Sequence, residues 1–403
     1  MDIRATDDAV TRRIKFFTDR EARLRANDLY YYNLPVEEVK GGARVVVKGR
    51  EMGMYASYSY LGLIGHPRIN AAAKAAVDKY GTGTNGVRLL AGTLKLHTEL
   101  EETIADFKHA EAAITYSSGY STNLTVISTL MGRGDYVLSD KLNHASIVDG
   151  CLMSGAEFRR FRHNDMDDLE KRLQQVPEGV SKLVIADAVF SMDGDVLDLP
   201  KTVVLCKKYN AWLMIDEAHS VGVLGKTGRG IEEEFGLGDV VDIKMGTLSK
   251  TIPSVGGYVA GKKELVQYLR HASRAYIFSA ALPPAQAAAA NESFKVILDE
   301  PWRIEKLRKN ASQFINGLKG AGFDTMLTTT AIVPVLCGTD DRAFELTRQC
   351  HHHDLFVLPV VSPAVPEGLA RLRATVLAAH EPDEIDYALS VIIKAGKEIG
   401  IIS

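Results

Sequence analysis

The stretch "WLMIDEAHSVGVLGKTGRG" (residues 212–230) begins with an apolar run that ends in Asp216. This run lacks the alternation of a half-exposed strand and is typical of a strand buried on both faces, as in a parallel sheet covered by helices. A carboxylate at the tip of such a strand is costly to desolvate unless a cation or hydrogen bonds meet it. The stretch therefore predicts a buried sheet and a positive or hydrogen-bonding partner for Asp216.

Similar short apolar runs alternate with helix-like stretches between residues 70 and 280, a pattern that predicts a mainly parallel sheet covered on both faces. The expected strands are 112–117, 135–139, 157–161, 182–187, 212–216, 242–246 and 256–261. A helix opened by prolines is expected at 282–300. Beyond it, "TAIVPVLCG" (330–338) and "LARLRATV" (369–376) are expected to be strands, and "EPDEIDYALSVIIKAGKEIG" (381–400) an amphipathic helix.

These elements predict an α/β fold with a mainly parallel seven-stranded sheet and a smaller α+β C-terminal domain. We expect an N-terminal helix and arm at 1–45, a large domain at 46–285 and a small domain at 286–403.

The composition is that of an ordinary globular chain of 403 residues, 46% hydrophobic and 25% charged. A formal net charge of -3 gives no overall field to attract nucleic acid or anionic membrane, so we expect small-molecule or protein partners. No apolar run approaches the roughly 20 residues that span a bilayer, and the N-terminus mixes charges where a signal peptide would be apolar. The four cysteines show no CxxC spacing. We expect a soluble cytoplasmic protein with reduced thiols.

Two other patterns are interpreted as non-functional. "CHHHD" (350–354) places neighbouring side chains in different directions on a helix, so no metal site is expected. "GKT" (225–227) lacks the earlier glycine of a phosphate-binding loop, because that position is Ser220.

Polar residues at strand ends are the candidates for chemistry, because ligands collect at the carboxyl edge of an α/β sheet. Gly119 and Tyr120 follow the strand at 112–117 and could offer backbone amides to a phosphate at a helix start, or simply form a helix cap. His144 follows the strand at 135–139; its flat ring could stack on a cofactor, or serve as a local hydrogen-bonding or capping group.

Asp216, His219 and Lys250 together suggest a particular cofactor chemistry. Lys250 is the lone charged residue of "GTLSKTIPSVGG" (246–257), just after the strand at 242–246. An aspartate that keeps a pyridine nitrogen protonated makes the ring an electron sink, and a lysine amine can carry an aldehyde as a Schiff base.

Four ordered motifs, "LNHASIVDG", "VFSMDGD", "DEAHSVGVLGKTGRG" and "GTLSKTIPSVGG", closely resemble those of the α-oxoamine synthases, a family of pyridoxal-phosphate enzymes. The resemblance runs from about residue 45 to the C-terminus. It implies the fold type I of pyridoxal-phosphate-dependent transferases, which is aspartate aminotransferase-like, and a homodimer with its active site between the two subunits.

The resemblance also implies a role for individual residues. Lys250 would be the Schiff-base lysine, Asp216 the partner of the pyridine nitrogen, His219 a hydrogen-bond partner of the cofactor's phenolic oxygen and His144 the residue stacked on its ring. Ser191 and Thr247 fall on cofactor-contacting positions, Gly119 and Tyr120 on the phosphate site, and Ser279 would reach the neighbouring subunit's phosphate. Arg373 would bind the carboxylate of the amino acid; Arg371 is expected to be a solvated strand position.

The implied reaction is a decarboxylative Claisen condensation of glycine, alanine or serine with an acyl thioester of CoA or a carrier protein. Serine palmitoyltransferase and 8-amino-7-oxononanoate synthase are the alternatives within the family, but Val361 stands where both carry an arginine. Tyr58 and Ser59 replace a pair that usually contains asparagine. A different kind of alternative, a non-catalytic partner subunit, is disfavoured because Lys250, Asp216, His144 and His219 are all present. The substrates and the pathway stay open.

Overall fold

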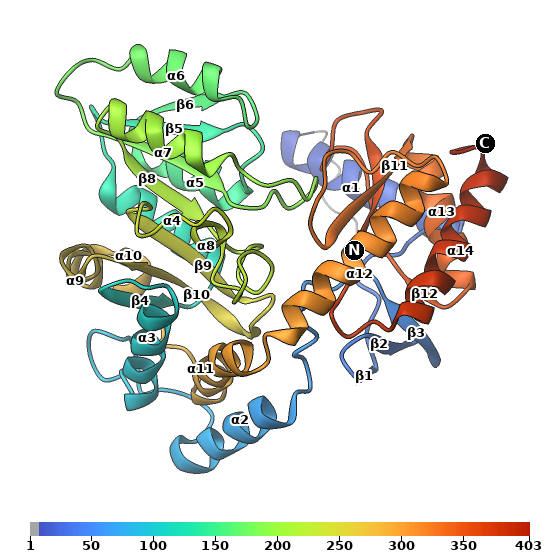
Figure 1. Ribbon diagram of the computed structural model, residues 1–403, viewed down its shortest axis with the longest axis horizontal. Helices are drawn as coiled ribbons and strands as arrows, with labels where there is room; N and C mark the ends of the chain where they lie inside the picture. The colour runs from blue at the N-terminus through green and yellow to red at the C-terminus, as the bar shows by residue number, and fades with distance from the viewer. Residues whose placement is uncertain (1–7) are drawn as a thin grey trace.

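A seven-stranded sheet forms the centre of the larger half of the protein, in a computed structural model that describes residues 8–403 (Figure 1). The strand order is β4-β10-β9-β8-β7-β5-β6, and only β10 runs antiparallel to its neighbours. The strands are β4 (Ala112–Tyr116), β5 (Tyr136–Asp140), β6 (Glu157–Phe161), β7 (Lys182–Asp187), β8 (Trp212–Asp216), β9 (Ile243–Ser249) and β10 (Pro253–Gly261). All seven predicted strands are confirmed. β9 and β10 are longer than expected because they pair with each other up to the turn at Lys250.

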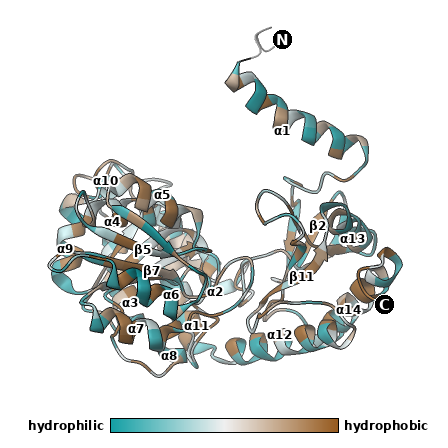
Figure 2. Ribbon diagram, turned by 90° about the horizontal axis from the view of Figure 1, so that it is seen from above, coloured by the Kyte–Doolittle hydropathy of each residue, from teal (hydrophilic) through white to brown (hydrophobic). Residues whose placement is uncertain are grey.

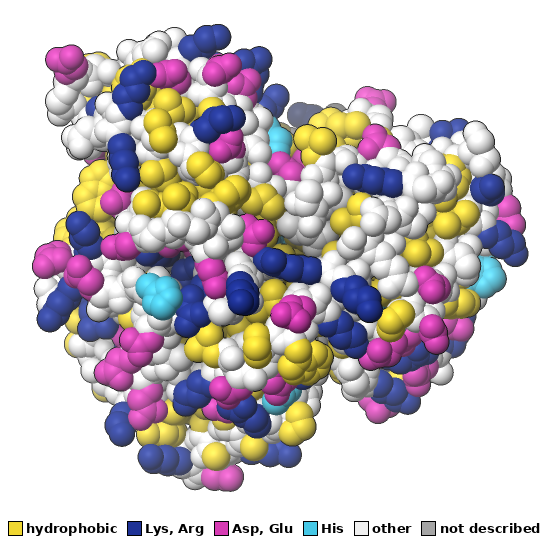
Figure 3. Space-filling model, in the orientation of Figure 1, with side chains coloured by type: hydrophobic (Ala, Val, Ile, Leu, Met, Phe, Trp, Pro, Cys, Tyr) yellow, Lys and Arg dark blue, Asp and Glu magenta, His cyan; other side chains and the backbone are white. Residues whose placement is uncertain are grey.

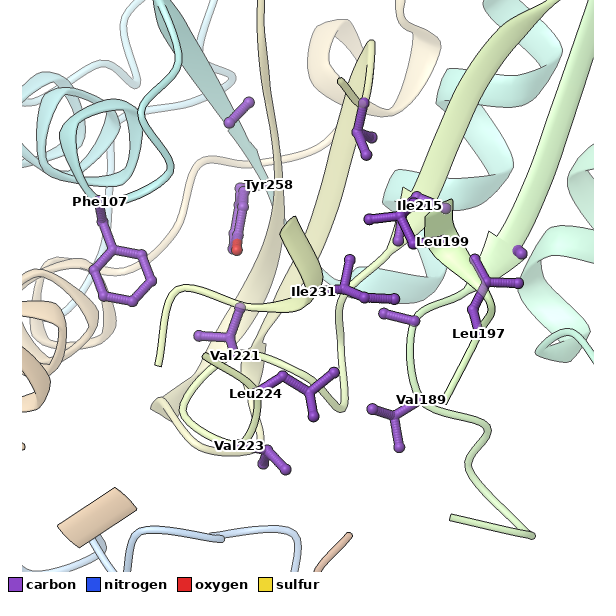
Figure 4. Packing of buried hydrophobic residues seen from close by; sticks show 14 of the residues in the cluster. Phe107, Val189, Leu197, Leu199, Ile215, Val221, Val223, Leu224, Ile231 and Tyr258 are labelled. Atoms are coloured by element: carbon purple, nitrogen blue, oxygen red, sulfur yellow. The ribbon is translucent and has the colours of Figure 1, made fainter. Parts of the chain in front are cut away.

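Helices cover both faces of this sheet, as the apolar runs predicted. Alternate residues of β7 enter different cores: Val184 packs on the face that contains Phe107, and Ile185 packs on the other. Figure 4 shows the first of these cores, where the loop residues Val221 and Leu224 pack near Ile231. The helices are α2 (Pro67–Tyr80), α3 (Lys95–Phe107), α4 (Gly119–Leu130), α5 (Ala145–Ser154), α6 (Met166–Gln174), α7 (Leu199–Lys208), α8 (Ile231–Glu234), α9 (Lys263–Ala272), α10 (Arg274–Ile277) and α11 (Pro284–Asp299). The last confirms the predicted proline-initiated helix.

A second, smaller sheet contains β11 (Ile332–Gly338), β14 (Ala370–Thr375) and β13 (Pro359–Val360), in that order. α12 (Trp302–Gly320), α13 (Asp340–His352) and α14 (Pro382–Ile399) accompany it. The two predicted strands and the C-terminal amphipathic helix are confirmed; β13 is too short to have been expected.

The N-terminal segment contains α1 (Ala9–Ala26), which projects away from the rest of the molecule in Figure 2. It is followed by β1 (Glu38–Lys40), β2 (Arg44–Val47) and β3 (Arg50–Met54). These three strands form a four-stranded sheet with β12 (Leu355–Phe356), which comes from the C-terminal part of the chain and pairs with β3. Of the predicted helix and arm at 1–45, residues 1–7 lie outside the described residues. The domain boundaries at 45 and 285 stay a prediction.

On the face drawn in Figure 3, acidic and basic side chains are interspersed. Within residues 8–403, no helix is long and apolar enough to cross a membrane. The four cysteines are buried and unpaired.

Candidate active site

A cavity of about 270 Å³ opens at the carboxyl ends of the central strands, and we call it the central cavity. Seven of its lining residues were predicted site residues, and they come from the ends of β8 and β9 or from the segments that follow β4, β5, β8 and β9. The lining comprises Ser118, Gly119, Tyr120, Asn123, His144, Ser146, Asp187, Val189, Asp216, Ala218, His219, Met245, Thr247, Ser249 and Lys250. The fold thus brings Gly119, Tyr120, His144, Asp216, His219, Thr247 and Lys250 to one place.

Asp216 ends β8 as a buried carboxylate whose two oxygens are both held. Asn123 Nδ2 donates to its Oδ2 at 2.7 Å, and the Ala218 amide donates to its Oδ1 at 2.9 Å. These bonds fix the orientation of the carboxylate at the cavity wall and offset part of its desolvation. Asn123 was not predicted, because its role depends on which face of α4 meets the sheet; its own Oδ1 is buried without a partner among the described residues.

Lys250 lies beside His219, with its Nζ 2.8 Å from Nε2 of the ring. The other ring nitrogen, Nδ1, is 2.6 Å from the hydroxyl of Tyr60. Burial lowers the pKa of Lys250 to about 8, although the nearby carboxylates Asp216 and Asp187 raise it in part. Burial and the neighbouring cation Lys250 lower the pKa of His219 well below its ordinary value. A neutral His219 therefore accepts from a protonated Lys250 and donates through Nδ1 to Tyr60.

Asp187, at the end of β7, is a second carboxylate in the cavity. It lies directly opposite Asp216 in the β7–β8 pair, and its Oδ2 accepts from the amide of His144 at 3.2 Å. Its Oδ1 is buried and lacks a partner in the described part of the chain. Burial and the adjacent Asp216 raise the pKa of Asp187 well above the ordinary value. The sequence argument that found Asp216 applies equally to the apolar run 182–187, so this residue could have been predicted.

His144 caps the N-terminus of α5, as the alternative interpretation of this residue predicted, and it also lines the cavity. Its Nδ1 is 2.7 Å from the Ser146 hydroxyl. Burial lowers the pKa of His144. The ring is therefore held in place by one nitrogen and presents a flat, largely neutral surface.

The N-terminus of α4 lies at another wall of the cavity and could hold an anion. Gly119 and Tyr120 are its first two residues, so their amides have no acceptor within the helix. Thr247 adds a hydroxyl that is 3.0 Å from Ser249 Oγ. A Cβ at Gly119 would stand 2.9 Å from Thr247 Oγ1, and one at Gly257 would stand 2.8 Å from the Cα of Gly119. Glycine at both positions lets the helix end approach the sheet closely.

Ser191 and Ser279, two predicted site residues, do not line the central cavity. The carbonyl of Ser191 accepts from Arg373 Nε at 2.6 Å. Ser279 lies in the segment after α10, next to the isolated bridge between Val87 and Ala280. Their roles toward a cofactor stay predictions.

Arg373 is buried beside the cavity, and its guanidinium is only partly used. Its Nη1 donates to Thr375 Oγ1 at 3.0 Å, whereas Nη2 is buried with no acceptor among the described residues. The guanidinium carbon lies 4.7 Å from the ring centre of Tyr58. The arrangement leaves one strong donor for an anionic ligand.

The prediction that Arg371 is solvated is wrong. Its side chain is 2% exposed and pairs with Asp193, while its Nε donates to the carbonyl of Leu369 at 3.0 Å. The loop that carries Asp193 is itself anchored, because His163 bridges Asp195 at 2.9 Å and Asp140 at 3.0 Å. These carboxylates outweigh burial and raise the pKa of His163 to about 10. Arg371 thus has a structural ion pair that only the folded chain creates.

The side chains present fit pyridoxal phosphate. An amine that is easily deprotonated suits an aldehyde, a helix N-terminus suits a phosphate, and a fixed carboxylate suits a protonated ring nitrogen. The unpartnered Oδ1 atoms of Asn123 and Asp187 also indicate that the cavity is built around a polar ligand.

Comparisons with known proteins agree with this geometry. The family model for class I and II aminotransferases matches residues 55–392. An 8-amino-7-oxononanoate synthase from Thermoanaerobacter pseudethanolicus is 43% identical over 92% of this chain and 94% of its own length. A serine palmitoyltransferase from Sphingobacterium spiritivorum is 40% identical over 98% of each chain. A solved variant of serine palmitoyltransferase from S. paucimobilis, with a bound pyridoxal phosphate–myriocin aldimine, superposes with a TM-score of 0.94 at 37% identity, covering 98% of this chain and 100% of the other.

Proposed function

The chain belongs to the α-oxoamine synthases, pyridoxal-phosphate enzymes of the class I and II aminotransferase family, and we propose that it joins glycine, alanine or serine to an acyl thioester with loss of carbon dioxide. The thioester is one of CoA or of an acyl carrier protein. The product is an α-amino ketone.

Pyridoxal phosphate, when bound, supplies an electron sink for negative charge at the α carbon of the amino acid. Asp216 would keep a proton on the ring nitrogen, and its bonds from Asn123 and Ala218 support this role because they hold the carboxylate in one orientation. His144 would cover the ring, and the α4 N-terminus with Thr247 would hold the phosphate.

Lys250 would bind the cofactor aldehyde at rest and move the α proton during the reaction. Its lowered pKa supports both tasks, since a neutral amine is the nucleophile and the base. His219, which stays neutral and lies 2.8 Å from Lys250, would orient the amine by accepting a hydrogen bond from it. Arg373 would grip the carboxylate of the amino acid with its unpartnered Nη2.

The reaction balances as follows. The α C–H bond breaks and its proton passes to Lys250; a C–C bond then forms between the α carbon and the thioester carbonyl carbon. The C–S bond breaks and the sulfur leaves as a thiol with a proton. The bond to the carboxylate breaks and carbon dioxide leaves. The α proton held by Lys250 meets one of the two protons that the thiol and the α carbon take up, and solvent supplies the other, so the overall reaction consumes one proton.

The observation that carries the proposal is a lysine amine of lowered pKa held against His219 in the cavity that also contains Asp216. Incubation with pyridoxal phosphate should give a visible absorption band that is absent in Lys250→Ala. Glycine, alanine and serine are then screened against acyl-CoAs of different lengths and an acylated carrier protein, with the released thiol measured. A colourless protein, or thiol release from no donor, contradicts the proposal.

We also propose a homodimer in which Ser279 of one subunit completes the other subunit's phosphate site. Apolar side chains near this segment support it: Phe278 is 71% exposed and Leu90 is 81% exposed. Equal mixing and reassociation of Lys250→Ala and Ser279→Trp chains should restore about a quarter of wild-type activity, because half of the dimers then hold one intact site. No recovery on mixing contradicts a shared site.

A further inference from the structure

A second cavity of about 580 Å³ adjoins the central cavity and shares Ser249 and Lys250 with it. It lies where the segment 57–65 meets α2 and α11, which run side by side (Figure 1). The shared residues mean that a molecule in the second cavity touches the same lysine as a ligand in the central cavity.

The second cavity has an apolar wall. Leu63, Ile69 and Ala289 lie in the core behind this wall, and the accessible apolar surface comes from Ile64, which is 40% exposed, and Tyr58, which is 42% exposed. Apolar surface left open to water beside a reaction centre is typical of a binding site for an apolar group.

Charge is nearly absent from this cavity. Lys250 is the one charged side chain among its lining residues, and the remaining polar groups are hydroxyls and amides such as Ser57 and Gln286. In the proposed function Lys250 binds the cofactor and moves the α proton, so it does not provide a counter-ion for a second group. A carboxylate in this cavity would lose its hydration without gaining a partner.

Tyr58 separates the second cavity from the other cation nearby. Its ring lines the cavity, and its centre is 4.7 Å from the Arg373 guanidinium and 5.8 Å from Lys250 Nζ. Arg373 does not line the cavity. Because the Tyr58 ring lies between the Arg373 guanidinium and the second cavity, this cavity is faced by an uncharged ring. The guanidinium then binds the carboxylate of the amino acid and not a group in the second cavity.

We propose that the second cavity binds the acyl group of the thioester donor and selects an uncharged aliphatic chain over one that ends in a carboxylate. The inference rests on the proposed function and adds to it the chemical class of the acyl substrate. Each methylene buried in the cavity strengthens binding about fourfold.

The test uses the holoenzyme and two donors of equal length, octanoyl-CoA and its ω-carboxy counterpart, with thiol release as the measurement. We expect kcat/KM to favour octanoyl-CoA by at least thirtyfold. Equal use of the two donors, or preference for the ω-carboxy donor, overturns the inference.

Binding is measured separately by calorimetry with unreactive S-alkyl-CoA thioethers. Affinity should rise about sixteenfold with each pair of methylenes that the cavity buries in the wild type. Ala285→Phe, which fills the cavity from a partly exposed position on α11, should abolish that increment. An increment that is absent in the wild type, or unchanged in the variant, also overturns the inference.

A charge placed in the cavity should reverse its selectivity. Ile64→Arg supplies the missing counter-ion from a side chain that is already partly exposed, and should raise kcat/KM for the ω-carboxy donor at least tenfold while lowering it for octanoyl-CoA. Leu327→Arg is the matched control, since Leu327 is 82% exposed and outside both cavities, and should change neither value.

Exchange of the amino acid's α proton in deuterated water needs no acyl donor and separates the two possible failures. Exchange without thiol release from any donor overturns the condensation, while the calorimetry still decides the acyl cavity. Thiol release from both donors at equal rates overturns the acyl inference and leaves the condensation standing.

Discussion

In the cofactor-free protein, the amine of Lys250 should titrate near pH 8. Burial lowers its pKa from 10.5 to about 8. A lowering of about 2.5 pKa units corresponds to about 3 kcal/mol in favour of the neutral amine. Because the folded protein binds fewer protons than the unfolded chain between these values, Lys250 destabilises the fold below pH 8, and the penalty is relieved as the pH rises from 8 to 10.5. At pH 7 about a tenth of the amine would be neutral, roughly three hundred times more than for an ordinary lysine.

The assay is competitive acetylation with acetic anhydride over a range of pH, with peptide mass spectrometry of the fragment that contains Lys250. Lys95, whose side chain is 78% exposed, serves as the reference for reagent decay in the same digest. Asp216→Asn should lower the pKa of Lys250 further, because it removes a carboxylate that favours the ammonium form. Asp383→Asn, on the exposed start of α14, is the matched control. An inflection near the ordinary lysine value, or an upward shift in Asp216→Asn, refutes the reasoning.

Three further predictions concern the surroundings of this lysine. Arg373→Lys should raise KM for the amino acid about 10- to 100-fold without changing the cofactor's absorption band, because an ammonium cannot keep the bonds to Ser191 and Thr375 and still offer a donor where Nη2 lies; an unchanged KM contradicts the assignment. Gly257→Ala should weaken pyridoxal-phosphate binding at least tenfold in absorbance titrations, whereas Gly238→Ala, with open space around its Cα, should not. His163→Gln should lower the urea midpoint most near pH 6 and least near pH 10. The pKa of His163 is raised to about 10 in the folded protein, so the protonated ring stabilises the fold fully below the ordinary histidine pKa, and this stabilisation is lost as the pH rises through about 10. A difference in midpoint that does not depend on pH contradicts this.

The large sheet could be predicted because most of its strands are apolar runs that can be recognised without knowing their partners; β6, with the sequence EFRRF, is the exception. β12 and β13 could not, since each is two residues long and exists through pairing with remote segments: Leu355 pairs with Gly53, and Pro359 pairs with Leu372. The residues of such a short strand do not indicate which remote segment it pairs with, so the strand cannot be predicted from local sequence.

The catalytic candidates follow a similar division. Asp216 ends β8 and Lys250 directly follows β9, so both lie at the same edge of the sheet. Tyr60 and Asn123 escaped prediction, because Tyr60 reaches His219 from an irregular segment 159 positions away and Asn123 reaches Asp216 across 93 positions. The sequence shows which residues can do chemistry near a strand end, but not which distant side chains orient them.

Arg371 and Arg373 illustrate what the folded structure adds. Both lie in β14 with the same side-chain direction, both are buried, and the sequence separates them only by resemblance. The structure separates them by their bonds. Arg371 uses its Nη1 on Asp193 and the carbonyl of Met192, so its charge is already neutralised inside the protein. Among the described residues, Arg373 has carbonyl and hydroxyl acceptors but no carboxylate partner, and its Nη2 lacks a hydrogen-bond acceptor. A buried guanidinium without a carboxylate partner has a desolvation cost that no internal ion pair offsets. The carboxylate of the substrate would supply that ion pair, so its binding to Arg373 is favoured.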